Sequence, residues 1–364
     1  RASAALHSAM RMHIKYKEYF ADMGICKLTE LLKEKAPKSV RNTQAEKCRG
    51  WRVAIDASMI LYQSLVAIRH GIDSLTNKEG ETTAHIYGIF YKTINILEKG
   101  IIPVYIFDGQ APELKENTLQ ERRDRKEKAE KDLEAAETEE DREKYVKRAV
   151  RATKYHVESA QALLKAMGVP YETAPNEAEG YCAALNAAGY VDAVVSEDMD
   201  SLAFGGKMLL RNLLPSIMKK NVPVMEICLE TALKQTELEH TEFVDLCILL
   251  GCDYCKRPKG VGPKKAYELI QKHRTIEKIV ECESLQIDAD SWPYKEARNI
   301  FLLQRVDRPK AFAIDAPDTE ELFRFLVDAN GFDRGKVQSG VNRLNAVKKA
   351  KKQSSLLSFA KKVI

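Results

Sequence analysis

Short apolar runs alternate along the chain with longer segments whose apolar positions recur at helical spacing. Residues 51–55, 102–107 and 192–195 are mostly apolar and are typical of strands buried on both faces of a sheet. Residues 57–68, expected to be amphipathic, and residues 84–99 have apolar side chains every three or four positions, which predicts helices. This alternation predicts an α/β fold in which helices flank a mostly parallel central sheet.

The same alternation continues into the second half of the chain. It predicts helices over 156–167, 178–188 and 241–251, and strands over 169–171 and 191–195. After the last of these helices comes Gly-Val-Gly-Pro-Lys-Lys at 260–265, which opens another helix. Backbone N–H groups of such a turn, together with a helix N-terminus, can hold a DNA phosphate. Residues 241–275 are therefore interpreted as a helix-hairpin-helix DNA-binding element, in which Lys264 and Lys265 add positive charge.

Residues 114–155 differ from their surroundings because nearly every position is charged or alanine. A basic first part, an acidic middle and a basic end follow one another without glycine or proline. One interpretation is a solvated helical pair or coiled coil with ion pairs along its surface. The alternative is a helical lid that grips phosphates, which its insertion between two strands of the predicted sheet favours.

Seven carboxylates lie in five short clusters, three of which follow predicted strands. They are Asp56, Asp108, Glu177, Glu179, Asp198, Asp200 and Asp253. A single Asp after a strand is usually a helix cap or a turn residue, but five clusters are poorly explained in that way. Carboxylates at the ends of parallel strands converge on one edge of the sheet, where their mutual repulsion requires a cation. The pattern predicts two divalent cations, with Mg²⁺ as the usual ion where phosphates react.

Composition narrows the class of protein. The chain has 364 residues and a net charge of +5, so any nucleic-acid surface must come from local basic patches. No apolar run is long enough for a membrane span, and no membrane association is expected. The 8 cysteines lack a disulfide framework and are interpreted as reduced thiols of an intracellular protein. Cys252 and Cys255 form a C-x-x-C motif without a second pair for zinc, so we interpret them as ordinary buried cysteines.

Taken together and in order, these motifs resemble the structure-specific 5′ nucleases. They are MGICKL, VAIDAS, YIFDG, APNEAEGYCA, SEDMDSLAFG, FVDLCILLGCDY and GVGPKKA. The resemblance is to the eukaryotic and archaeal flap endonucleases and covers residues 23 to about 345. It implies a PIN-like nuclease core over 23–345, a helical arch over about 110–155, and removal of 5′ flaps at duplex junctions, with 5′–3′ exonuclease activity, in DNA replication and repair.

The resemblance also implies roles for individual residues. The seven carboxylates become ligands of two Mg²⁺ ions, with Mn²⁺ as a substitute, and Asp56, Asp108, Glu177 and Asp200 are counted among the catalytic residues. Lys115 and Arg122 match the basic pair at the base of the arch, which would steer and polarise the scissile phosphate.

Further matches concern DNA contacts. Tyr62 matches a tyrosine on which a nucleobase stacks, although packing of its helix explains it equally. The matches to the region that receives a short 3′ flap are Arg69, Leu75, Thr83, Lys92 and Arg324. The matches to the downstream duplex anchor are Gly260, Gly262, Lys264 and Lys265.

The two ends of the chain are interpreted separately from the core. Residues 346–364 read as a flexible tail in which Gln353, Leu356 and Phe359 resemble a sliding-clamp-binding box, with Ala360 in place of a second aromatic residue. The resemblance implies the proliferating cell nuclear antigen as partner, a monomer of which three can occupy one trimeric clamp, and a nuclear location, with the mitochondrion as the alternative. Residues 1–22 are interpreted as a disordered leader or extension.

Three other functions compete with a flap endonuclease. The first is an exonuclease or junction resolvase of the same superfamily, against which the compact charged segment and the tail argue. The second is a catalytically silent DNA-binding clamp partner, against which the complete set of carboxylates argues. An unrelated phosphatase or metal-binding module is the third, and the predicted DNA anchor at 260–265 argues against it.

Overall fold

The computed structural model describes most of the chain between residues 25 and 360. The described residues are 25, 27–67, 76–77, 80–110, 112–116, 118, 120, 123–124, 127–128, 131–132, 138, 152–214, 222–283, 285, 292–306 and 312–360, with side chains described up to 348. The predicted leader, most of the predicted arch and the side chains of the predicted clamp box lie outside this set.

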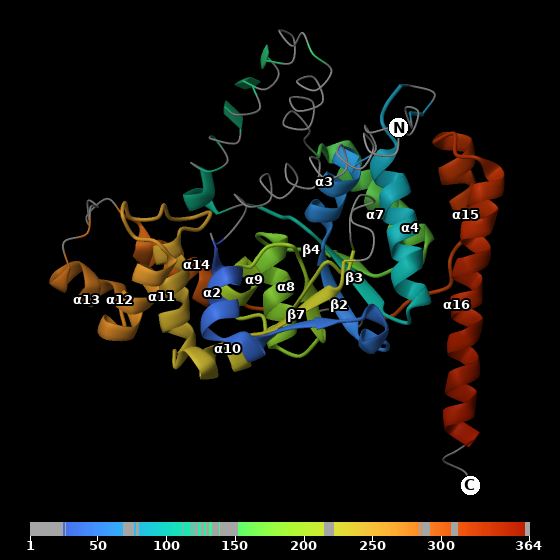
Figure 1. Cartoon of the computed structure of the whole chain (residues 1–364). Helices are drawn as coiled ribbons and strands as arrows, with labels where there is room; N and C mark the ends of the chain where they lie inside the picture. The colour runs from blue at the N-terminus through green and yellow to red at the C-terminus, as the bar shows by residue number, and fades with distance from the viewer. Residues whose placement is uncertain are drawn as a thin grey trace.

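A single seven-stranded sheet forms the centre of the described fold (Figure 1). In spatial order its strands are β1 (Val40–Thr43), β7 (Val224–Cys228), β6 (Met208–Arg211), β5 (Ala193–Val195), β2 (Arg52–Asp56), β3 (Ile102–Phe107) and β4 (Tyr171–Thr173). Strands β1 and β6 pair antiparallel with β7, whereas β6, β5, β2, β3 and β4 pair parallel. The prediction of a mostly parallel sheet in an α/β fold is therefore confirmed.

The sheet separates two hydrophobic cores because side chains of a strand alternate between its faces. On β2, Ala54 faces the first core, whereas Val53 and Ile55 face the second. The first core is covered by α2 (Leu28–Lys35), α8 (Ala178–Ala187), α9 (Asp200–Ala203), α10 (Leu229–Thr236) and α11 (His240–Leu250). The second is covered by α3 (Ala57–Ala67), α4 (Ala84–Glu98), α7 (Lys154–Ala166), α15 (Thr319–Phe323) and α16 (Arg334–Ala360).

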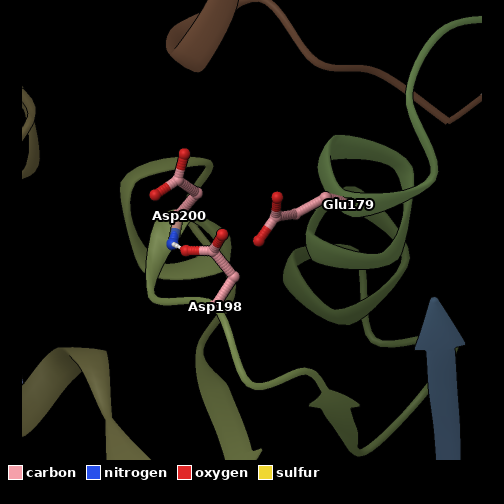
Figure 2. Close-up of side chains that lie close together, drawn as sticks. All are labelled: Glu179, Asp198 and Asp200. Carbon is pink, nitrogen blue, oxygen red and sulfur yellow. Dashed lines mark hydrogen bonds between the residues drawn. The ribbon is translucent and has the colours of Figure 1, made fainter. Parts of the chain in front are cut away.

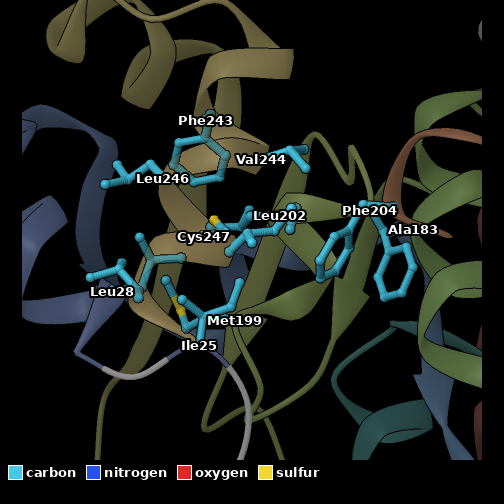
Figure 3. Packing of buried hydrophobic residues seen from close by; sticks show 14 of the residues in the cluster. Ile25, Leu28, Ala183, Met199, Leu202, Phe204, Phe243, Val244, Leu246 and Cys247 are labelled. Carbon is cyan, nitrogen blue, oxygen red and sulfur yellow. The ribbon is translucent and has the colours of Figure 1, made fainter. Parts of the chain in front are cut away.

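The first core joins the start of the described chain to its centre. Figure 3 shows Ile25 and Leu28 beside Met199 and Leu202, with Phe243 and Cys247 of α11 packed over them. This packing holds the N-terminal segment against the loop that precedes α9.

Three further helices extend the first core away from the sheet, at the side opposite α16 (Figure 1). They are α12 (Pro263–His273), α13 (Ile276–Cys282) and α14 (Tyr294–Leu302). Arg298 of α14 ties them to α11: its Nε lies 2.6 Å from Oδ1 of the buried Asp245, and its Nη1 lies 2.8 Å from Oε1 of Glu277 on α13. Breaking such a buried pair on one side leaves an uncompensated charge, so this network fixes how the helices are placed.

The expected elements are present, with shifted boundaries. The predicted strand at 169–171 was wrong by two residues: the N–H of Val169 donates to the carbonyl of Leu164 at 2.9 Å and closes α7, so β4 begins at Tyr171. Helix α3 is not clearly amphipathic, because Gln63 and Ser64 are buried along with its apolar residues. The other predicted helices and strands match observed elements to within two residues at each end.

At the C-terminal end, the sequence predicted a flexible tail from residue 346, whereas the backbone of α16 stays helical to Ala360. Of the helices in the described part of the chain, none is both long and apolar enough to cross a membrane.

Candidate active site

Two strand ends supply the first pair of carboxylates. Asp56 is the last residue of β2, and Asp108 directly follows β3, which pairs in parallel with β2. Ser58 links the pair: its N–H donates to Asp56 Oδ1 at 2.8 Å, and its hydroxyl donates to Asp108 Oδ2 at 2.5 Å. Asp108 Oδ1 accepts a hydrogen bond of 2.8 Å from the N–H of Ala178 at the start of α8. The parallel register thus places both carboxylates at the sheet edge where α8 begins.

A second group joins helix α8 to the loop after β5 (Figure 2). The carboxylate oxygens of Glu179, Asp198 and Asp200 lie within 4.8 Å of one another. The N–H of Asp200 donates to Asp198 Oδ1 at 3.2 Å, and the N–H of Ile25 donates to Asp200 Oδ1 at 2.9 Å. Figure 2 shows Glu179 extending from α8 toward Asp198, with Asp200 beside Asp198. One cation could therefore be shared by three carboxylates.

The pKa shifts of these carboxyl groups show that their negative charges are unfavourable without a cation. Burial, together with the neighbouring carboxylates Asp198 and Asp200, raises the pKa of Glu179 well above its ordinary value. Burial, and to a smaller extent the charge of Asp198, also raises the pKa of Asp200 well above its ordinary value. Burial and the nearby Asp108 raise the pKa of Asp56 to about 7. An all-oxygen donor set of crowded anions is what a hard divalent cation such as Mg²⁺ binds, so the residues present fit that ion.

Lys115 holds the remaining two carboxylates together. It lies in η4 (Glu113–Lys115), forms a close ion pair with Glu177, and its Nζ is 3.0 Å from Asp253 Oδ2. Burial alone would lower the pKa of Lys115, but Asp253 and Glu177 outweigh it and raise the pKa above the ordinary value. The ammonium group therefore keeps its charge at physiological pH. Tyr254 completes the group, since its hydroxyl donates to the other oxygen of Glu177.

All seven predicted carboxylates lie in one electrostatically connected region. Asp253 raises the pKa of both Asp198 and Asp200, and Asp56 raises that of Glu179, although burial is the larger cause in each case. Sequence reasoning gave no role to Tyr254 or Ser58, although both stand inside quoted motifs. Their hydrogen bonds to Glu177 and Asp108 could not be read from spacing alone.

The residues predicted to contact DNA lie in several places. Tyr62 is half-buried on α3, and Lys92 of α4 donates to Gln63 Oε1 at 2.9 Å. Thr83 is only 1% exposed at the start of α4, so its contact with a 3′ flap stays a prediction. Arg324 is exposed in η5 (Arg324–Ala329). Arg69, Leu75 and Arg122 lie outside the described residues, as do the side chains of Gln353, Leu356 and Phe359.

The predicted DNA anchor lies between α11 and α12. Gly260 has a φ of +75°, a conformation that glycine adopts without strain, and Gly262 caps α12 at its N-terminus. Lys264 and Lys265, in the first turn of α12, are exposed. Exposed cations beside a helix N-terminus suit a phosphate, and binding of DNA at this turn stays a prediction.

Two protein-family models and a group of known relatives match this chain. Residues 23–129 match the XPG N-terminal domain, and residues 168–253 match the XPG I-region. Flap endonuclease 1 of Homo sapiens is 44% identical over 350 residues, which cover 93% of this chain and 91% of that protein.

Solved structures are also similar to this chain over most of its length. The flap endonuclease-1 from Methanococcus jannaschii has a TM-score of 0.67 and 34% identity, over 86% of this chain and 97% of that one. The catalytic core of Rad2 in complex with a DNA substrate has a TM-score of 0.67 and 25% identity, over 88% of this chain and 100% of that one. The carboxylate-lined edge of the sheet and these similarities together show that the chain belongs to the flap endonuclease family of metal-dependent, structure-specific nucleases.

Proposed function

We propose that this protein hydrolyses a phosphodiester at the base of a 5′ DNA flap, and acts also as a 5′–3′ exonuclease, with two Mg²⁺ ions held by its seven clustered carboxylates. The observation that carries the proposal is the group of the half-buried Glu179 and Asp198 and the buried Asp200, within 4.8 Å of one another and with raised pKa values. Such a group is unfavourable unless a cation neutralises it.

The metal would be held by the two linked sets of carboxylates. Glu179, Asp198 and Asp200 form one set, and Asp56 and Asp108, which Ser58 links, form the other. Glu177 and Asp253 complete the seven and also pair with Lys115. When bound, paired Mg²⁺ ions supply a water of lowered pKa and stabilise charge on the leaving oxygen, and Mn²⁺ can substitute.

The protein's own cation in this site is Lys115. Its charge is fixed by Asp253 and Glu177, so it can donate hydrogen bonds to a phosphate at the same place. Preorganised donors of this kind stabilise the charge that develops in the transition state. Tyr254 holds Glu177 from the other side and so keeps the carboxylate that pairs with Lys115 in place. Arg122, seven positions later, is proposed as the second cation on the scissile phosphate.

Substrate selection would combine several surfaces. The exposed Lys264 and Lys265 would grip the downstream duplex through phosphates, independently of sequence. Tyr62 would stack a base near the scissile bond, and the residues proposed for the 3′ flap are Arg69, Leu75, Thr83, Lys92 and Arg324. The catalytic core of Rad2, which this chain resembles, was solved with a DNA substrate.

A second proposed partner is the sliding clamp, the proliferating cell nuclear antigen. The support is Gln353, Leu356 and Phe359, whose spacing fits the clamp-binding box. The last two lie at i,i+3, so a helical turn would present them on one side. This partner suits a monomeric nuclease acting in the nucleus during replication, and up to three copies could bind a trimeric clamp.

Cleavage of defined DNA branches tests the proposed function. The protein is incubated with Mg²⁺ and a 5′-labelled double-flap duplex, with gapped and four-way junctions of the same sequences alongside. The proposal expects cut products at the flap base and much slower cutting of the four-way junction. Preference for the four-way junction would instead support a resolvase, and binding without cleavage would support a DNA-binding clamp partner.

A further inference from the structure

Two free cysteines face each other across the turn that carries site residues. The N–H of Cys252 donates to the carbonyl of Cys255 at 3.0 Å, and the N–H of Cys255 donates to the carbonyl of Cys252 at 3.3 Å. The two residues between them are Asp253, which contacts Lys115, and Tyr254, which contacts Glu177. The thiols therefore bracket both contacts on the Lys115 side of the site.

The backbone geometry suits a disulfide. Residues that exchange both hydrogen bonds in an antiparallel pair have Cα atoms about 5.5 Å apart. Disulfides form when Cα atoms lie roughly 4.4 to 6.8 Å apart. Among the described residues, the one group of three side chains able to hold a metal is the acidic one, so the thiols lack the further ligands of a zinc site.

We propose that Cys252 and Cys255 form a reversible disulfide, by exchange with a small disulfide such as oxidised glutathione, and that this bond switches off the nuclease. Cys252 is half-buried whereas Cys255 is 3% exposed, so Cys252 is the thiol that reacts first with glutathione. Cys252 loses its proton as its sulfur attacks oxidised glutathione, which releases one glutathione thiolate and forms a mixed disulfide. The thiolate of Cys255 then attacks the Cys252 sulfur and releases the second glutathione. The protein loses two protons and two electrons, and oxidised glutathione becomes two thiols.

The effect on the site follows from the small size of the ring. Bringing the two sulfurs to about 2.05 Å tilts the four-residue turn and with it Asp253 and Tyr254. Displacement of reacting groups by about 1 Å costs roughly 10²-fold in rate. We therefore expect the oxidised enzyme to cut flaps about 10- to 100-fold more slowly, with DNA binding less affected than cleavage because the exposed Lys264 and Lys265 lie outside the closed ring.

The test measures formation of the disulfide and the nuclease activity separately. The full chain is equilibrated in glutathione buffers of increasing oxidation, its free thiols are alkylated, and the peptide containing both cysteines is examined by tandem mass spectrometry. We expect an internal bond between Cys252 and Cys255, reversed by dithiothreitol, whether or not the DNA substrate has been identified correctly. Single-turnover cleavage of the same samples should fall and recover with the bond.

Two variants complete the test. Cys252→Ser should keep its activity under oxidation, whereas Cys282→Ser, which removes an exposed thiol remote from the turn, should behave like the unchanged protein. Alkylation of both Cys252 and Cys255 in the oxidised sample, or a glutathione adduct on Cys252 alone, would overturn the proposal. An internal bond that leaves cleavage unchanged would overturn the switch.

Discussion

The Nζ atom of Lys115 lies 3.0 Å from the Oδ2 atom of Asp253, although 138 positions separate the two residues. Lys115 comes from the short helix that follows β3 and Asp253 from the turn after α11, so their contact joins the charged segment to the carboxylate-lined edge of the sheet. Thr118 strengthens the same connection, since its hydroxyl donates to the backbone carbonyl of Asp253 at 2.6 Å.

Replacing Lys115 should affect chemistry more than binding. In Lys115→Ala the fixed ammonium is lost, and the single-turnover rate at saturating enzyme should fall by about 10²- to 10³-fold, as for loss of a comparable electrostatic donor. Lys115→Arg keeps the charge and should retain more of the rate. A variant whose saturated rate is normal and whose affinity alone is weaker would assign Lys115 to the binding surface.

The clustered carboxylates should make metal stabilisation depend on pH. The pKa of Asp56 rises from 3.8 to about 7 on folding because of burial and Asp108, so the metal-free protein binds this proton more tightly when folded. That contribution to stability is fully present below about pH 3.8 and is lost as pH rises through about 7. Added Mg²⁺ should raise Tm more at about pH 8 than at about pH 6, where protons compete for the carboxylates.

Thermal unfolding with and without Mg²⁺ at both pH values checks this expectation. Asp56→Asn removes one of the titrating carboxyls and serves as the control, with a smaller difference between the two conditions. Equal gains in Tm at both pH values would mean that the carboxylates do not bind the ion as a crowded set.

Gly109 should tolerate no side chain, because a Cβ atom there would lie 2.0 Å from the carbonyl oxygen of Ala174 and 2.9 Å from that of Pro175. Those are backbone atoms that position Glu177, so Gly109→Ala should destabilise the protein by about 1–3 kcal/mol. Chemical denaturation measures the change. Gly262→Ala is the comparison: nothing lies within 4 Å of its added Cβ, and as a helix cap it should lose at most about 1 kcal/mol. Equal losses in both variants would contradict the close packing behind Asp108.

The lysines of α12 should contribute salt-sensitive affinity. If Lys264 and Lys265 both contact phosphates, changing them to Ala should weaken duplex binding and reduce the slope of log K against log salt by about one to two. The control is Lys234→Ala, an exposed lysine paired with Glu230, which should leave the slope as it was. Fluorescence anisotropy over a salt series gives the slopes, and an unchanged slope in the double variant would exclude these side chains from the interface.

Much of the site was predictable because it is built on local signals. An apolar run followed by an acidic residue, as at Asp56 and Asp108, predicts both the strand and the edge of the sheet at which the carboxylate lies. The other side of the sheet was not predicted: β6 and β7 pair antiparallel with each other, a contact between two segments that a local apolar run does not reveal.

Contacts between residues that are far apart in the sequence could not be predicted either. The hydrogen bond between Tyr254 and Glu177 and the position of Lys115 between two carboxylates depend on how the turn after α11 meets the start of α8, which no spacing in the sequence encodes. The two backbone hydrogen bonds between Cys252 and Cys255 are local, yet a C-x-x-C motif alone does not show which turn the chain adopts there.

Single-turnover cleavage of a 5′-labelled double-flap duplex by Asp200→Ala tests most directly whether the clustered carboxylates hold the ions needed to cut the flap. With limiting Mg²⁺, the variant should cut at least about 10²-fold more slowly than the unchanged protein while binding the DNA at least as tightly, because an anion beside a polyanion has been removed. Cleavage by Asp200→Ala within a few-fold of the unchanged protein would contradict the claim.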